Sequence, residues 1–156
     1  MDKPTFLNPV IRGFNPDPTV CVVPASGDVP TTYYLSTSTF EYFPGCAIYS
    51  STNLIDWTLI GHALTRRSQI ELRTVEPGAG SWASTLRYRE KEKRWYLANC
   101  LFQRYRPKTD VNFPHTFSLP LNRLVVPWVW PSLTRRPRVG AHIPTGFLCL
   151  HRQHPR

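Results

Sequence analysis

Short runs of β-branched and aromatic residues alternate with turn-forming residues over much of the first hundred positions. From residue 31 to residue 100 these runs recur at the spacing typical of an all-β fold, and no amphipathic helical pattern competes with them. The expected strands are residues 32–39, 47–51, 57–60, 85–89 and 95–99. The charged segment 90–93, Glu-Lys-Glu-Lys, joins the last two and suits a solvated hairpin connection. The pattern therefore predicts an all-β fold.

The pattern changes near residue 106. Eight prolines fall between residue 107 and residue 156, where short apolar patches alternate with scattered arginines. Proline removes donors from a strand ladder and interrupts its periodicity. We therefore predict a domain at residues 1–106 and an irregular Pro- and Arg-rich tail at residues 107–156.

The net charge of +9 points at first to a nucleic-acid partner. Residues 1–106 carry 12 Lys and Arg against 9 Asp and Glu, a balance of +3, whereas residues 107–156 carry 7 against 1, a balance of +6. The excess belongs mainly to the tail, and no nucleic-acid-binding motif accompanies it. We expect no nucleic-acid partner.

Hydropathy and cysteine spacing narrow the class of protein further. No run of about 18 apolar residues occurs, and the N-terminus lacks the pattern of a secretory signal, so we expect no membrane partner and, for the chain expressed as written, a cytoplasmic location. The four cysteines are widely spaced, without a CxxC pair. Such thiols are typically free and buried, so we expect no metal and no cofactor.

A single carboxylate lies between two prolines near the N-terminus. Residues 8–19 read Asn-Pro-(x)4-Phe-Asn-Pro-Asp-Pro-Thr, and the acid is Asp17. Proline fixes φ on each side, which restricts the position of this side chain, as catalysis requires. Asp beside Pro also occurs in turns for structural reasons, because its side chain bonds nearby backbone N–H groups. The motif alone leaves both interpretations open.

Further motifs follow in a defined order. Residues 33–45 read YYLSTSTFEYFPG, residues 48–57 read IYSSTNLIDW, and residues 80–88 read GSWASTLRY. Together with the proline-flanked acid, this series is similar to the opening of family 43 glycoside hydrolases, the β-xylosidase and α-L-arabinofuranosidase group. The resemblance covers about residues 8–106. One departure is Ser84, where the family usually has Pro, and we expect it to loosen a turn near the site.

The resemblance implies a five-bladed β-propeller, of which this chain supplies about the first two blades. It also implies inverting hydrolysis of xylosidic or arabinosidic bonds, with a xylo-oligosaccharide or arabinoside as partner. Asp17 then falls in the general-base position, where a carboxylate deprotonates the attacking water.

Two aromatic residues in the matching motifs are candidates for the sugar-binding surface. Phe40 and Trp82 are expected to line the pocket, because aromatic faces suit a pentose ring. Packing between blades is the alternative for both residues, since Phe and Trp in sheets are usually at least half buried.

The resemblance also implies carboxylates that this sequence does not supply in the family's motifs. The general-acid Glu and the pKa-modulating Asp come from motifs resembling EGP and DPS, and neither occurs here. No Glu follows Glu92 and no Asp follows Asp110, whose surroundings match no family pattern. We therefore predict a truncated and inactive glycosidase, or alternatively a vestigial, non-catalytic carbohydrate-binding chain. The hypothesis for residues 107–156 is that they are not native family sequence.

Overall fold

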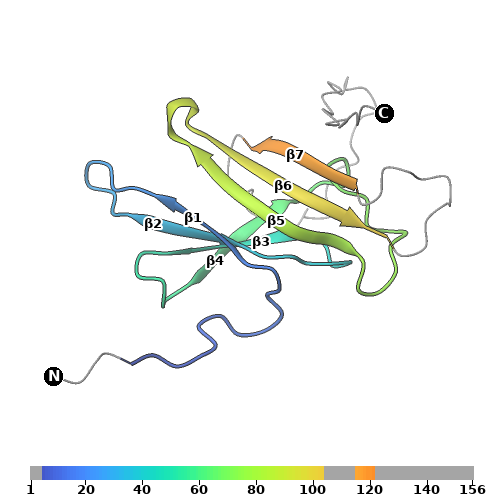
Figure 1. Ribbon diagram of the computed structural model, residues 1–156, viewed down its shortest axis with the longest axis horizontal. Coiled ribbons are helices and arrows are strands. Elements are labelled where there is room, and N and C mark those ends of the chain that lie inside the picture. Colours follow the sequence, from blue (N-terminus) through green and yellow to red (C-terminus); the bar gives the residue numbers. More distant parts are fainter. Residues whose placement is uncertain (1–4, 104–114, 122–156) are drawn as a thin grey trace, which may run out of the picture.

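The structure is a computed structural model that describes residues 5–103 and 115–121, and it contains two antiparallel sheets (Figure 1). The first sheet has the order β1-β2-β3-β4 and the second the order β5-β6-β7. Within each sheet, consecutive strands are therefore neighbours. No helix in the described ranges is long and apolar enough to cross a membrane. The all-β prediction is confirmed.

The first sheet is formed by β1 (Thr19–Val23), β2 (Thr32–Ser36), β3 (Gly45–Ser51) and β4 (Thr58–Leu64). Strand β1 was not among the expected strands, although its sequence TVCVV is rich in β-branched residues. The strand expected at residues 32–39 ends early, at Ser36. It ends there because the chain then turns towards the second sheet, where the N–H groups of Thr39 and Phe40 both donate to the Ser81 carbonyl.

The two faces of the first sheet differ in what covers them. Cys21 and Tyr34 are paired across β1 and β2 and belong to the core or pack against it. The opposite face carries the cross-strand row Val20–Leu35–Tyr49–Leu59. At the two ends of this row, Val20 is 42% exposed and Leu59 is 50% exposed. The first sheet thus has one face in the core and one apolar face only partly covered by described residues.

The second sheet is formed by β5 (Gly80–Arg89), β6 (Arg94–Phe102) and β7 (His115–Leu121). A 3₁₀ turn, η1 (Glu90–Glu92), joins β5 to β6, so the charged segment is a hairpin connection, as predicted. The core lies between the sheets, where buried Leu86, Leu97 and Leu121 meet the face of the first sheet that holds Tyr34. The rings of Tyr34 and Trp95 are in edge-to-face contact across this boundary, 4.8 Å between centroids.

Strand β7 lies inside the segment predicted to be irregular. Residues 115–121 alternate exposed and more buried positions and pair with β6 from Trp95 to Leu101. The irregularity predicted from the prolines is therefore wrong for these seven residues, because β7 is the last strand in the order of its sheet, where Pro120 can be accommodated. The rest of the predicted tail lies outside the described residues, and the boundary at residue 106 stays a prediction.

The two sheets meet at a backbone bridge for which Gly80 is required. Phe40 and Ser81 exchange hydrogen bonds in both directions, Phe40 N to Ser81 O at 3.1 Å and Ser81 N to Phe40 O at 2.9 Å. Gly80 has φ of +98°, and a Cβ there would lie 2.6 Å from the Phe40 carbonyl carbon and closer still to its oxygen. Only a residue without a side chain allows the backbones this close.

Replacing Gly80 by Ala is expected to lower the free energy of unfolding by about 3 kcal/mol, because it combines a left-handed φ with a clash against backbone. Gly27→Ala is the matched control, since Gly27 has φ of +55° and a Cβ at that position would meet nothing within 4 Å. It is expected to cost only about 1 kcal/mol. Urea unfolding measures both variants, and equal losses would contradict the role given to the close approach.

Candidate active site

Asp17 is an exposed residue in a constrained turn just before β1. Asp17 has φ of 52°, in the left-handed region, between Pro16 and Pro18. A residue that precedes proline normally adopts extended backbone, so this conformation is sparsely populated and requires support from its surroundings. The support comes from Ser38, whose backbone N–H donates to the Pro16 carbonyl at 2.9 Å. The two prolines were expected to restrict Asp17, but the left-handed conformation was not foreseen.

Ser38 also contacts the carboxylate itself. Its Oγ donates to Asp17 Oδ2 at 2.7 Å, and the same Oγ accepts the Ala83 backbone N–H at 2.7 Å. The Ser38 side chain is fully buried. One hydroxyl therefore links the turn that carries Asp17 to strand β5 of the second sheet.

Strand β5 is irregular at this contact. Its pairing with β6 shifts register between Trp82 and Thr85, and Ala83 has φ of 43°. Such a bulge re-aims side chains and backbone groups relative to a regular strand. Here the irregular stretch includes the Ala83 N–H that bonds Ser38.

Aromatic rings gather beside this junction. Phe40 lies 5.6 Å from Trp82 between ring centroids and 5.1 Å from Phe14, in an edge-to-face arrangement with the latter. Trp82 is half-buried and stacks on Phe102 at 4.1 Å with nearly parallel planes. The structure thus brings together the two aromatic residues selected from sequence, Phe40 and Trp82. Stacking on Phe102 gives Trp82 a packing role as well.

Two open hollows adjoin these rings. One, of about 460 Å³, is lined by Phe14, Phe40, Glu41, Tyr42 and Gly78. Glu41 holds the wall of this hollow in place, because its Oε2 accepts the Gly78 N–H at 3.1 Å. Phe14 and Tyr42 are more than half exposed.

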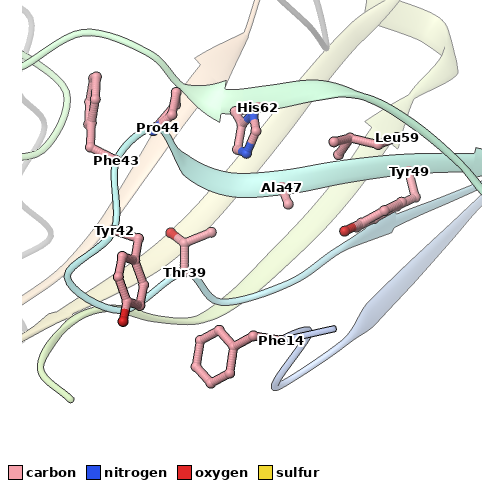
Figure 2. A pocket seen from close by; sticks show the side chains of 9 residues that line it. All are labelled: Phe14, Thr39, Tyr42, Phe43, Pro44, Ala47, Tyr49, Leu59 and His62. Atoms are coloured by element: carbon pink, nitrogen blue, oxygen red, sulfur yellow. The ribbon is translucent and has the colours of Figure 1, made fainter. Parts of the chain in front are cut away.

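The second hollow, of about 240 Å³, shares Phe14 and Tyr42 with the first (Figure 2). Figure 2 shows Phe14 and Tyr42 at one side and His62 and Leu59, from β4, at the other. Burial lowers the pKa of His62. Phe43, which lines this hollow, is 45% exposed.

Behind the site, buried polar side chains connect the two sheets. Ser36 Oγ and Ser84 Oγ are 2.8 Å apart, so Ser84, which lies within β5 and not in a turn, makes a buried hydrogen bond; the loosening expected from the loss of Pro stays a prediction. Asn99 donates to the Trp82 carbonyl at 3.1 Å and to Cys46 Sγ at 3.3 Å. We call this group of buried side chains the polar seam; its members are Ser36, Ser38, Cys46, Ser81, Ser84 and Asn99.

Sequence reasoning missed Ser38, Phe14 and Asn99. Ser38 and Phe14 lie within the quoted motifs, but their contacts join segments far apart in sequence. Asn99 occupies an inward position of a strand that is otherwise apolar on that face, and this was the available signal.

No cluster of three His, Cys, Asp or Glu side chains suited to a metal ion occurs within residues 5–103 and 115–121.

The fold and the site together define the class of protein. Two successive antiparallel meanders packed face to face are the arrangement of neighbouring propeller blades. Residues 6–120 match the family described as glycosyl hydrolases family 43. The chain belongs to this family, and its two sheets are the first blades of the family's β-propeller.

Curated relatives include a xylan 1,3-β-xylosidase of Vibrio sp., 46% identical over 84 residues, which are 54% of this chain and 15% of the relative. A non-reducing end α-L-arabinofuranosidase of Bacteroides ovatus is 49% identical over 87 residues, 55% of this chain and 15% of the relative. The chain therefore spans about 15% of the length of these relatives.

Solved structures resemble the chain over more of its length. A family 43 protein of the Bacteroides ovatus xyloglucan PUL superposes with a TM-score of 0.61 at 36% identity, covering 80% of this chain and 22% of that one. The BlXynB protein of Bacillus licheniformis gives a TM-score of 0.62 at 28% identity, covering 77% and 22%. The match to the family also extends beyond residue 106, to residue 120.

The polar seam predicts a stability change at alkaline pH. Burial raises the pKa of the Cys46 thiol to about 11 from 9.0, although the bonds from Ser81 and Ser84 oppose the shift. The folded state thus holds the proton that the unfolded state releases. The resulting stabilisation is complete below pH 9, declines as pH rises and is lost through about pH 11.

Over that interval the contribution amounts to about 3 kcal/mol. Cys46→Ser, which cannot ionise in this range, is expected to remove this pH dependence of the free energy of unfolding. The measurement is urea unfolding of wild type and variant at matched pH values, because the difference between the two curves cancels the tyrosines and lysines that also titrate. Parallel curves would contradict the assignment.

Proposed function

We propose that Asp17 is the general base of an inverting glycosidase that acts on xylosides or arabinosides. The observation that carries the proposal is an exposed residue, Asp17, whose left-handed turn is supported by the Ser38 backbone N–H and whose carboxylate accepts a bond from the fully buried Ser38 hydroxyl. A base must accept a proton from water without changing its own position, and this arrangement suits that task. Family membership agrees with the proposal.

In this reaction Asp17 removes a proton from a water molecule. The water oxygen forms a bond to the anomeric carbon, while the bond from that carbon to the leaving oxygen breaks and the leaving group takes the electron pair. Attack from the face opposite the leaving group inverts the anomeric centre. A carboxylic acid on the other side of the sugar normally protonates the leaving oxygen.

The substrate class follows from the hollow and from the relatives. Phe14, Phe40 and Tyr42 offer ring faces and edges around the larger hollow, an arrangement suited to a small sugar ring. The curated relatives carry the names of xylosidases and arabinofuranosidases, whose sugars are both pentoses. We propose Phe40 and Trp82 as part of the wall against which the pentose lies.

The sequence supplies the base in its family motif but not the acid. A substrate that needs no acid separates these two halves of the mechanism. Dinitrophenolate leaves as an anion without protonation, so a dinitrophenyl glycoside requires only the base. Natural xylosides, with their poor leaving groups, are expected to react slowly or not at all.

Wild-type protein is expected to hydrolyse 2,4-dinitrophenyl β-xyloside or the corresponding α-L-arabinofuranoside. Asp17→Asn is expected to lower kcat by about a hundredfold or more, because the amide keeps the shape of the side chain and cannot take the proton. Release of dinitrophenolate is followed by absorbance, and the anomer first formed is identified by NMR.

Formation of the retained anomer, or equal turnover by wild type and Asp17→Asn, would refute the proposed base. Binding of xylose or arabinose without turnover would favour the alternative, a non-catalytic carbohydrate-binding chain. The aromatic hollow is the feature on which that alternative rests.

Phe40→Ala is expected to weaken binding of the aryl xyloside about tenfold, seen as a higher KM, because it removes a ring from the wall. Phe43→Ala is the control, since Phe43 is a phenylalanine three residues away that lines the other hollow. Its KM is expected to stay within about twofold of wild type. Equal effects in the two variants would assign Phe40 to packing alone.

A further inference from the structure

We propose that Ser38 is a positioning residue that anchors Asp17 through Oδ2 and so makes Oδ1 the oxygen that accepts the proton from water. This inference rests on the proposed function of Asp17. It adds a residue that acts through the base and identifies which carboxylate oxygen reacts.

The direction of the hydrogen bond is fixed by chemistry. The Ala83 backbone N–H can only donate, so Ser38 Oγ is its acceptor. The single hydroxyl proton of Ser38 is then directed to Asp17 Oδ2 at 2.7 Å. The bond therefore holds Asp17 by Oδ2 and fixes the orientation of its carboxylate.

Burial makes this anchor selective for one oxygen. Ser38 has 0% exposure, so water does not compete for its hydroxyl. Asp17 as a residue is exposed, and no described residue donates a hydrogen bond to its Oδ1. The two oxygens are therefore in different environments: one is held from the protein side and the other is available to a water molecule.

The Ser38 hydroxyl also connects Asp17 to the strand that carries Trp82, one of the residues proposed to contact the pentose. Ser38 accepts from Ala83, the chain neighbour of Trp82, at the irregular part of β5. Asp17 lies two residues before β1 of the first sheet and Trp82 lies in β5 of the second, and Ser38 is bonded to both segments. The two short hydrogen bonds of the Ser38 hydroxyl resist a displacement of the Asp17 turn relative to β5. Such a restraint matters because a misplacement of about 1 Å slows a reaction of this kind.

Ser38→Ala is the test, and Ser36→Ala is the matched control. Ser36 is equally buried, lies two residues away and bonds Ser84 of the same strand β5, but it does not contact Asp17. Kinetics on the dinitrophenyl glycoside and urea unfolding are measured for both. Ser38→Ala is expected to lower kcat by about ten- to a hundredfold with KM within about twofold, whereas Ser36→Ala is expected to lose comparable stability and keep its kcat.

A double variant then separates positioning from general damage. If Ser38 acts through Asp17, Asp17→Asn combined with Ser38→Ala is expected to be no slower than Asp17→Asn alone. Should Ser38→Ala fail to fold, Ser38→Cys keeps the shape and replaces the hydroxyl by a weak donor. The same loss of kcat is expected for it.

The outcomes distinguish the two proposals. Turnover that depends on Asp17 but is equally affected by Ser38→Ala and Ser36→Ala overturns the positioning role and leaves the base in place. A multiplicative loss in the double variant does the same. Turnover in wild type that does not depend on Asp17, or no turnover at all, overturns the proposed function and this inference with it.

Discussion

The backbone of Phe40 pairs with that of Ser81, and this bridge between the sheets sets the relative position of every group at the site. Phe40 carries a ring of the hollow, and Ser81 directly precedes Trp82. The bridge requires Gly80, whose missing side chain leaves room for the Phe40 carbonyl. From this point the chain leads back through Thr39 to Ser38, and thus to Asp17. A single constraint on backbone approach therefore determines where the base and the aromatic rings lie.

Around the bridge the sheets are joined by hydroxyls and an amide as well as by apolar packing. A typical buried hydrogen bond contributes only about 1 kcal/mol net, but leaving one partner unsatisfied costs about 1–3 kcal/mol. The polar seam therefore favours one relative position of the two sheets. Any other packing that separates Ser36 from Ser84, or Asn99 from the Trp82 carbonyl, is less stable. Apolar contacts such as those of Leu86 and Leu97 tolerate sliding more easily, since they have no direction.

How much the sequence could predict depends on the range of each interaction. The strands β2 to β6 follow from local alternation and turn residues, and the motifs identified Asp17, Phe40 and Trp82 as candidates. Ser38 could not be assigned in this way, because its partners lie 21 and 45 residues away. The positive φ of Asp17 was likewise hidden, since it depends on support from Ser38 and not on the prolines beside it. Strand β7 was missed because proline was weighed without knowing that the strand is last in its sheet.

The outer faces of the two sheets differ in the polarity of their side chains. In the second sheet, Arg87 and Arg89 lie on the outer face, and Arg89 pairs with Glu92. The outer face of the first sheet is apolar at Val20 and Leu59, which suits the contact that a propeller blade makes with its next neighbour. Asp17 lies two residues before β1, the strand that carries Val20. Packing against that face would therefore also bear on the turn that holds the carboxylate, so the rigidity of the base is linked to how completely the first sheet is covered.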